Sequence, residues 1–384
     1  QGRAFGIHVI LGSQTLGGAF TLARATLGQM VIRIALMCNE ADAYLIMDDT
    51  NPAPRLLTRP GEGIYNDSAG MPEANSPFQV VWLNDEERIS YLSQVAQLSQ
   101  QRGFAQRPQV VFEGNAPASV ADATEINQAI AERSWSGAPR LFLGAPNSIK
   151  GPTEAPFERQ SGSNLMIVGQ RDDVIEGMVA IGLHLLHEQL GEKARLIVID
   201  GSLSDPNSAS WLKEAITWTR GTIETPDANA MGNRINELAA EMKQKSDGSL
   251  EIGDQTTFIV VLGLQKYKKL RYEEDFSFSL DDDGGDAKPS DSLNELITDG
   301  PGLGYHVILS IDTYNNVNRC LSRKATSEFE KKILFQMSAN DSASLIDSGK
   351  ASDLGMNRAI YYNEPTGVAE TFRPFAQPEK EWFA

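Results

Sequence analysis

The stretch GIHVILGSQT at residues 6–15 decides the fold, because it returns 298 positions later as GYHVILSIDT at residues 304–313. Six of the ten positions are identical. Further along, the pair Ile64-Tyr65 has a counterpart in Ile360-Tyr361, so the similarity keeps its order. Self-similarity over such a length indicates two copies of one domain in tandem. The pattern predicts that the first copy is truncated at its N-terminus.

Short apolar runs alternate with helical patterns in the second copy. We expect buried strands at Leu165–Val168, Leu196–Asp200 and Phe258–Leu262, with helices at Val174–Leu190 and Asn229–Lys245. Strands that alternate with helices in this way indicate a parallel sheet that is covered on both faces. The sequence therefore predicts an α/β fold with mostly parallel sheets.

The first copy contains shorter elements and ends in a connector. His8–Leu11 is predicted to be a buried strand, and its abrupt start leads us to expect a sequence that begins inside a domain. Asp85–Gln101 is predicted to be a polar connecting helix. The remaining expected elements are an apolar run at Met30–Met37, helices at Leu16–Gln29 and Glu40–Met47, and strands at Ile64–Asn66, Phe78–Leu83 and Gln109–Phe112. We place the two domains at residues 1–105 and 106–384, with an acidic loop at Asp281–Asp286 in the second. The open sheet edge of the first copy predicts self-association.

The composition is that of a globular protein. Of the 384 residues, 41% are hydrophobic and 22% are charged, which excludes a disordered or membrane-embedded chain. Two cysteines and four histidines leave little room for disulfides or a zinc site, so no metal site is expected. The net charge of −17 argues against a broad phosphate-binding face, although a narrow nucleic-acid channel stays compatible with it.

Residues 3–14 resemble the FtsK/SpoIIIE branch of the P-loop ATPases, which is related to HerA. In that branch a strand with a Gly-Ile-His…Thr-Gln pattern follows the Walker B strand. Val31–Ile34 resembles the family's arginine-bearing strand, and Pro60–Gly63 resembles its late Gly-acid turn. The resemblance covers most of the chain. It implies tandem RecA-like P-loop NTPase domains, the first truncated at its N-terminus.

ATP hydrolysis on a P-loop needs a glycine-rich turn, a lysine for the β- and γ-phosphates, and a hydroxyl residue for Mg²⁺. In the second copy, Gly169 and Gln170 occupy the start of this slot. Counting onward, Val174, Ile175 and Glu176 stand where the second glycine, the lysine and the hydroxyl residue belong. Only Gly169 and Gln170 are left as candidate nucleotide contacts, and they are weak ones.

The candidate Walker B strand of the second copy lacks its acid as well. The strand at Phe258–Leu262 runs into Gly263–Gln265, which contains no carboxylate. We therefore predict that the second copy is a degenerate, non-hydrolysing domain without tight ATP binding. The alternative is that it never was a P-loop domain, since a strand followed by glycine and a helix is common in α/β folds.

Two residues of the first copy are candidate catalytic residues. The resemblance implies that Gln14 is a sensor that orients water, whereas a generic strand-end polar residue would have no such role. Arg33 lies in an apolar strand, where an unpaired charge is costly. It is either paired locally or an arginine finger that reaches a neighbouring subunit's nucleotide. Arg59 is a rival for the finger. At an offset of 300, the second copy has Ile333 in place of Arg33.

Two further motifs have ordinary interpretations. His184 and His187 form His-Leu-Leu-His-Glu, which differs from the His-x-x-Glu-His of metallopeptidases and indicates packing. Lys266–Arg271 is basic with an interleaved tyrosine, a composition that can bind nucleic acid. Acidic residues follow it at once, which favours a solvated helix face.

The resemblance implies the C-terminal portion of an ATP-dependent DNA translocase of the FtsK/SpoIIIE type. The parent protein would use ATP and Mg²⁺, bind double-stranded DNA, assemble into a ring, and work in the cytoplasm. This chain alone is predicted not to hydrolyse ATP. The alternative is an ATPase of a type VII-like secretion system, whose degenerate domain binds a secreted protein. A third possibility is a purely structural interaction module.

Overall fold

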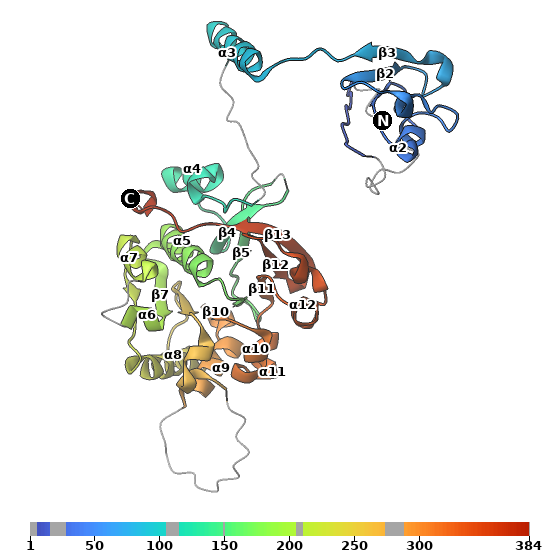
Figure 1. The fold of residues 1–384 in the computed structure, drawn as a ribbon. Coiled ribbons are helices and arrows are strands. Elements are labelled where there is room, and N and C mark those ends of the chain that lie inside the picture. The colour runs from blue at the N-terminus through green and yellow to red at the C-terminus, as the bar shows by residue number, and fades with distance from the viewer. Residues whose placement is uncertain are drawn as a thin grey trace. The chain divides into compact units, whose positions relative to one another are not determined.

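The computed structural model describes residues 6–15, 28–104, 115–148, 150–204, 210–272 and 288–383. The chain divides into a smaller unit, Gln1–Val110, and a larger unit, Val111–Ala384 (Figure 1). The expected helix at Leu16–Gln29 lies mostly outside the described residues. The expected strand at Gln109–Phe112 and loop at Asp281–Asp286 lie wholly outside them. Among the described helices, none has the length and apolar character that a bilayer crossing requires.

A sheet of ten strands forms the larger unit, in the order β5-β4-β13-β12-β11-β6-β10-β9-β7-β8. The strands from β11 to β8 run parallel to their neighbours, and those from β5 to β12 pair antiparallel. The mostly parallel α/β sheet is therefore confirmed. The strands are β4 Arg140–Pro146, β5 Thr153–Pro156, β6 Leu165–Val168, β7 Ala194–Ile199, β8 Ile223–Glu224, β9 Thr256–Val261, β10 Tyr305–Ile311, β11 Lys331–Leu334, β12 Ala359–Asn363 and β13 Val368–Pro374.

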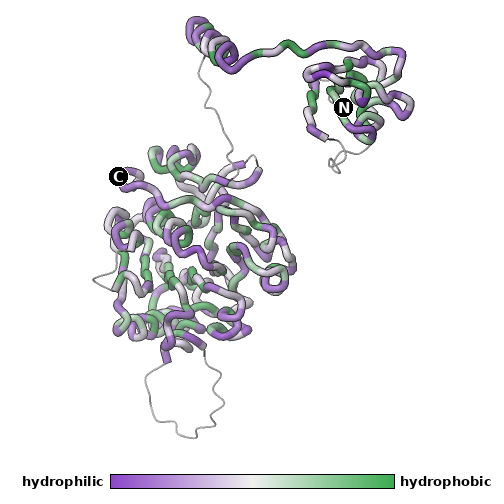
Figure 2. Tube along the Cα trace, viewed as in Figure 1, coloured by the Kyte–Doolittle hydropathy of each residue, from purple (hydrophilic) through white to green (hydrophobic). Residues whose placement is uncertain are grey.

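Helices cover both faces of this sheet, as the alternating sequence pattern predicts. The apolar helix α5, Asp172–Leu190, packs on one face, and α8, α9 and α12 pack on the other. Figure 2 shows apolar segments gathered inside the larger unit, where the strands lie. The other helices are α4 Thr124–Glu132, α6 Gly201–Ser204, α7 Trp211–Trp218, α8 Ala230–Ser246, α9 Pro289–Asp299, α10 Tyr314–Cys320, α11 Arg323–Ser327 and α12 Ala339–Ile346.

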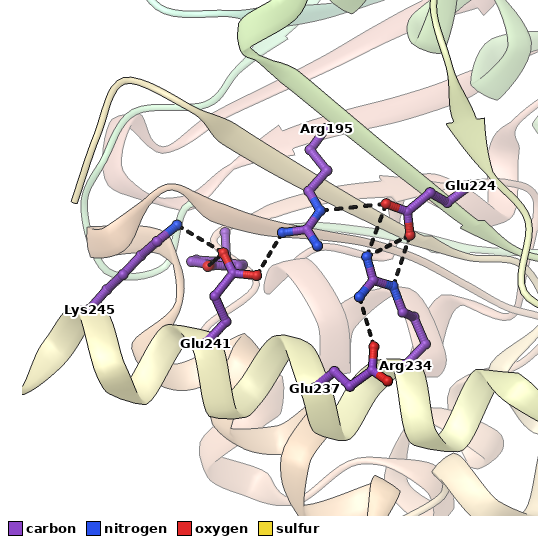
Figure 3. Close-up of polar contacts among 7 residues, drawn as sticks. Arg195, Glu224, Arg234, Glu237, Glu241 and Lys245 are labelled. Carbon is purple, nitrogen blue, oxygen red and sulfur yellow. Dashed lines mark hydrogen bonds and ion pairs between the residues drawn. The ribbon is translucent and has the colours of Figure 1, made fainter. Parts of the chain in front are cut away.

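A network of charged side chains fixes α8 against the amino ends of β7 and β10. The guanidinium of Arg195 donates to Glu241 at 2.7 Å, and Lys245 lies 3.1 Å from the same carboxylate (Figure 3). The hydroxyl of Tyr305 donates to Glu241 at 2.6 Å. Arg234 bridges Glu224 and Glu237 on the same side of α8, as Figure 3 shows.

The smaller unit contains a three-stranded antiparallel sheet, β1-β2-β3. Its core is small and consists of Ala35, Met47 and Ile64. The third strand ends at Gln79 and not at Leu83, because the residues that follow it have no strand partner. The elements are β1 Arg33–Leu36, α2 Glu40–Ile46, β2 Glu62–Asn66, β3 Ser76–Gln79 and the helix α3 Asp85–Gln101.

The strand, helix and hairpin of the smaller unit repeat β11, α12, β12 and β13 of the larger one. Asn39 and Ser338 each cap the helix by accepting from an amide three residues on. Ile34 pairs with Tyr65, as Ile333 pairs with Tyr361. Arg33 thus corresponds to Lys332, and the sequence-based match to Ile333 is wrong by one position. A single-residue difference in spacing shifts the register between the two copies.

The expected buried strand at His8–Leu11 is wrong. These residues are exposed and belong to no strand. Their counterparts in β10 pair with β6 on one side and β9 on the other. The described part of the smaller unit places no strand beside residues 8–11, and an apolar run without a partner cannot form a ladder. Residues 8–11 are apolar enough to form a strand, but an adjacent strand must be present for them to pair.

Candidate functional site

The parallel strands of the larger sheet end together at one edge, which is where ligands bind in open α/β sheets. The order β11-β6-β10-β9-β7 puts the carboxyl end of β6 between those of β10 and β11. Three residues separate the end of β6 from the start of helix α5 at Asp172. This edge, with the start of α5, is the candidate functional site.

Gly169 stands directly after β6 with a φ of +152°, a backbone conformation that favours glycine. A Cβ at this position would lie 2.6 Å from the Cβ of Phe335. The amide of Gly169 donates to the carbonyl of Ile311 at 3.0 Å, so it is engaged within the sheet. The glycine is thus required by packing against its neighbours. Gln170 follows it as an exposed bend residue.

The first turn of α5 is wound tightly and carries acidic side chains. The amides of Val174 and Ile175 both donate to the carbonyl of Arg171. The guanidinium of Arg171 binds the carboxylate of Asp173 at 3.1 Å, and this hydrogen bond lowers the pKa of Asp173. Asp172 lies 3.6 Å from the ammonium of Lys266, which follows β9. In a P-loop the cation lies on the helix and the acid follows the strand, so this pair is reversed.

Further carboxylates face the start of α5. Burial raises the pKa of Glu176, and the charges of Asp200 and Asp172 raise it further. Asp200 follows β7, is buried, and accepts hydrogen bonds from the amide and hydroxyl of Ser202. Burial and the charge of Asp200 also raise the pKa of Tyr267 to about 12. Asp172, Glu176 and Asp200 thus bring carboxylates to the helix start, where a bound phosphate is favoured by positive charge.

The ends of β9 and β10 are closed by local hydrogen bonds. The amide of Gly263 donates to the hydroxyl of Ser310 at 2.8 Å, and no carboxylate occurs at residues 262–265. Asp312 is the counterpart of Gln14. It accepts from the side chains of Asn316 at 2.7 Å and Thr313 at 3.3 Å, at the start of α10. Asp312 is therefore engaged in holding the first turn of that helix.

A cavity of about 290 Å³ adjoins the first turn of α5 on the side of β11. Arg171, Asp173, Phe335, Asn357 and Gln377 contribute to its wall. Sequence analysis missed this cavity because its residues come from distant parts of the chain. Phe335 follows β11 directly. Its position at the end of that strand is the one sequence signal that could have located this residue beside Gly169.

Gln14 and Arg33 belong to the smaller unit, whereas Gly169 and Gln170 belong to the larger one. Gln14 is an exposed bend residue. The guanidinium of Arg33 donates to the carbonyls of Met30, Ile46 and Met47, at 3.1, 3.1 and 2.7 Å. It thereby closes the C-terminal end of α2. The roles of Gln14 as a sensor and Arg33 as a finger stay predictions, and Arg33 has a structural role in addition.

No protein-family model and no curated protein matches the chain. Among solved structures, it is similar to the cytoplasmic domain of the type VII secretion ATPase EccC from Thermomonospora curvata, with 12% identity and a TM-score of 0.50. That alignment covers 68% of this chain and 32% of EccC, so the chain spans about a third of that protein.

Two further solved structures have lower scores. The pCW3 conjugation coupling protein TcpA has 12% identity and a TM-score of 0.48, over 85% of this chain and 88% of that one. EccC ATPases 2 and 3 with a signal sequence peptide have 11% identity and a TM-score of 0.47, over 84% and 54%. The EccC cytoplasmic domain, at its low identity, bears on the fold alone. It shows that the large sheet has the α/β fold found in the EccC cytoplasmic domain.

Proposed function

We propose that the chain is the C-terminal portion of an ATP-dependent translocase of the FtsK/SpoIIIE type. Residues 1–105 would be the C-terminal half of an ATPase domain, and residues 106–384 a second domain that does not hydrolyse ATP. The observation that carries this proposal is the structural repeat: β1, α2, β2 and β3 have the order and pairing of β11, α12, β12 and β13. This repeat supports the assignment of both copies to one kind of domain.

The second domain is proposed to be degenerate. The carboxylates of Asp172, Glu176 and Asp200 would disfavour phosphate, Lys266 is paired with Asp172, and the amide of Gly169 is engaged. These residues do not fit a magnesium nucleotide, so we assign no hydrolytic step to them. In a titration of the chain with ATP and Mg²⁺, we expect no binding heat up to millimolar nucleotide. Saturable binding at micromolar ATP would contradict the proposal.

Double-stranded DNA is the proposed translocated polymer. The test is the ATPase rate of the protein expressed from its full reading frame, with and without DNA. We expect the rate to rise with DNA and to fall by orders of magnitude in Arg33→Ala, the candidate finger. A comparable loss in Arg59→Ala instead would assign the finger to its exposed rival. Absence of any ATPase activity would contradict the translocase.

A protein substrate is the second candidate, and the net charge of −17 favours it. A strongly acidic chain repels nucleic acid at long range unless a basic channel is built elsewhere. The proposed activity is then that of a secretion ATPase whose second domain binds a protein partner. An ATPase rate that is indifferent to DNA but rises with a secreted protein would support this candidate against the first.

A further inference from the structure

A second cavity, of about 320 Å³, lies beside the C-terminal half of α5. Residues of α4, α5, Arg220 and two short helical turns, η4 (Val120–Asp122) and η11 (Lys380–Phe383), form its wall. His184 is the residue that α5 contributes, and it lies twelve positions after Asp172, which is about 18 Å along the helix axis. The cavity is therefore separate from the candidate site at the first turn of α5.

This cavity leads from the surface of the larger unit to a buried imidazole. Ala121, Arg220 and Glu381 of its wall are exposed, whereas His184 is 2% exposed. The ring of His184 lies 5.2 Å from that of Trp382, measured between the ring centroids. A small molecule that enters from solvent can therefore contact both rings.

Two ring nitrogens of this wall have unused hydrogen-bonding capacity. Nδ1 of His184 and Nε1 of Trp382 are buried, and neither has a hydrogen-bond partner among the described residues. Such atoms are rare in folded proteins, because burial removes their hydration and nothing replaces it. An indole N–H can only donate, whereas a neutral imidazole nitrogen donates or accepts according to its tautomer. A hydroxyl group, which both accepts and donates, satisfies the two nitrogens with either tautomer.

The charges around the cavity favour an uncharged occupant. Burial lowers the pKa of His184 to about 4; the charge of Glu188 opposes this shift, and those of Arg220 and His187 add to it. The imidazole is therefore neutral near pH 7. Arg220 is paired with Glu188 at 3.2 Å, and Glu381 is exposed to water, which screens its charge. A charged molecule would lose hydration here without gaining a close ion pair.

The cavity has room for a substituted ring. An apolar cavity of about 150 Å³ is enough to hold benzene, and Ile130 and the indole of Trp382 provide apolar wall here. We propose that the cavity binds a small uncharged molecule in which a hydroxyl group is attached to an apolar ring. The hydroxyl oxygen accepts from Nε1 of Trp382 and shares a hydrogen bond with Nδ1 of His184, while the ring lies against Ile130.

A phenol and its counterpart without the hydroxyl test this proposal. The chain contains five tryptophans, so its ¹⁵N spectrum has five indole N–H signals, and Trp382→Phe identifies that of Trp382. We expect 4-methylphenol at millimolar concentration to shift this signal saturably. Toluene should bind about tenfold more weakly, because it cannot form the hydrogen bonds. The signal of Trp218, whose ring also contacts Phe383, should stay in place.

Variants of the wall separate the hydrogen bonds from the apolar contact. His184→Phe keeps a ring but removes the nitrogens, and it should weaken the binding of 4-methylphenol about tenfold. His187→Phe is the matched control and should leave the affinity unchanged. If His184→Phe folds poorly, Ile130→Phe narrows the cavity without touching either nitrogen and should also weaken binding. Gln128→Phe, an exposed position on the same helix, should not.

Three results would overturn the proposal. Equal binding of toluene and 4-methylphenol would show that no hydroxyl is recognised, and equal shifts of all five indole signals would show non-specific binding. A Trp382 signal that does not respond would mean that water alone pairs with the two nitrogens. None of these measurements uses nucleotide, so they test the cavity independently of the proposed translocase.

Discussion

His306 is the most deeply buried titratable residue in the centre of the larger sheet. Its Nδ1 donates to the carbonyl of Ser163 at 2.8 Å, and its ring lies against those of Phe157 and Phe258. Burial lowers the pKa of His306 to about 4, and the charge of Lys331 adds to this effect although the Ser163 hydrogen bond opposes it. The imidazole is therefore neutral in the folded protein.

The depressed pKa makes stability depend on pH. The unfolded chain takes up this proton near pH 6.5 and the folded chain only near pH 4, so stability is complete above 6.5 and is lost as pH falls toward 4. We expect His306 to contribute about 3 kcal/mol of the free-energy loss between pH 7 and pH 4. Urea unfolding of the chain and of His306→Gln should show a shallower pH dependence in the variant. Equal slopes would show that His306 does not titrate as described.

The structural role of Arg33 at the end of α2 can be tested separately from its predicted role as an arginine finger. Because its guanidinium donates to two carbonyls at the end of α2 and to that of Met30, Arg33→Ala should destabilise the smaller unit by about 2 kcal/mol, the cost of hydrogen bonds to a charged group. Faster amide exchange in α2 would report this loss. Arg59→Ala is the matched control, since its side chain is 82% exposed and its change should stay within about 0.5 kcal/mol. Unchanged exchange in Arg33→Ala would contradict the structural role of Arg33.

At the scale of the element, the network along α8 holds this helix to the sheet. Burial alone would raise the pKa of Glu241, but hydrogen bonds from Tyr305, Arg195 and Lys245 outweigh it and lower the pKa to about 2. The contribution of Glu241 to the free energy of unfolding is complete above pH 4.5 and is lost as pH falls toward 2. Because the pKa of Glu241 in the folded protein is below its ordinary value, the folded state favours the ionised carboxylate.

Glu241→Gln should therefore lower the stability of the larger unit at pH 7 by about 1–2 kcal/mol, because it weakens several charge-assisted hydrogen bonds. Glu237→Gln is the control on the same helix, and its exposed pair with Arg234 should cost less than about 0.5 kcal/mol. Thermal unfolding of the two variants measures the difference. Equal losses of stability in the two variants would mean that the hydrogen bonds to Glu241 do not hold α8 against the sheet.

The elements with continuous apolar runs could be predicted from sequence, and those whose pairing depends on neighbours could not. Leu165–Val168 and Asp85–Gln101 match the structure at both ends. The run at residues 8–11 has the same apolar character but lies exposed, since pairing requires an adjacent strand. The short strands β5 and β8 gave no periodic signal, because two to four residues are too few to show one.

At the scale of the whole molecule, two copies of one motif experience different surroundings. Ile333→Lys should place an unpaired charge in the core and destabilise the larger unit by more than about 3 kcal/mol. Ile34→Lys, at the corresponding position, should change the smaller unit by less than about 0.5 kcal/mol. Unfolding of the two variants followed by residue-resolved amide exchange tests this. Similar losses of stability in the two variants would mean that Ile34 is covered in solution.

The candidate site was only partly predictable for a related reason. Gly169 was placed correctly after its strand, because a glycine between a strand and a helix is visible in sequence. The pairing of Lys266 with Asp172 was not predictable, since about ninety residues separate them and only the order of the parallel strands brings them together. The reversed order of the Lys266–Asp172 pair can be recognised only when the fold is known.

The tightly wound first turn of α5 has a consequence for how this protein could change. Replacing Val174, Ile175 and Glu176 by glycine, lysine and serine would complete the P-loop motif in letters. The backbone would still be helical from Asp172 onward, tied to Arg171 and to Lys266, where a loop must instead curve around a phosphate. Point substitutions alone would therefore not create a phosphate-binding loop here. That turn would first have to unwind, at a loss of stability.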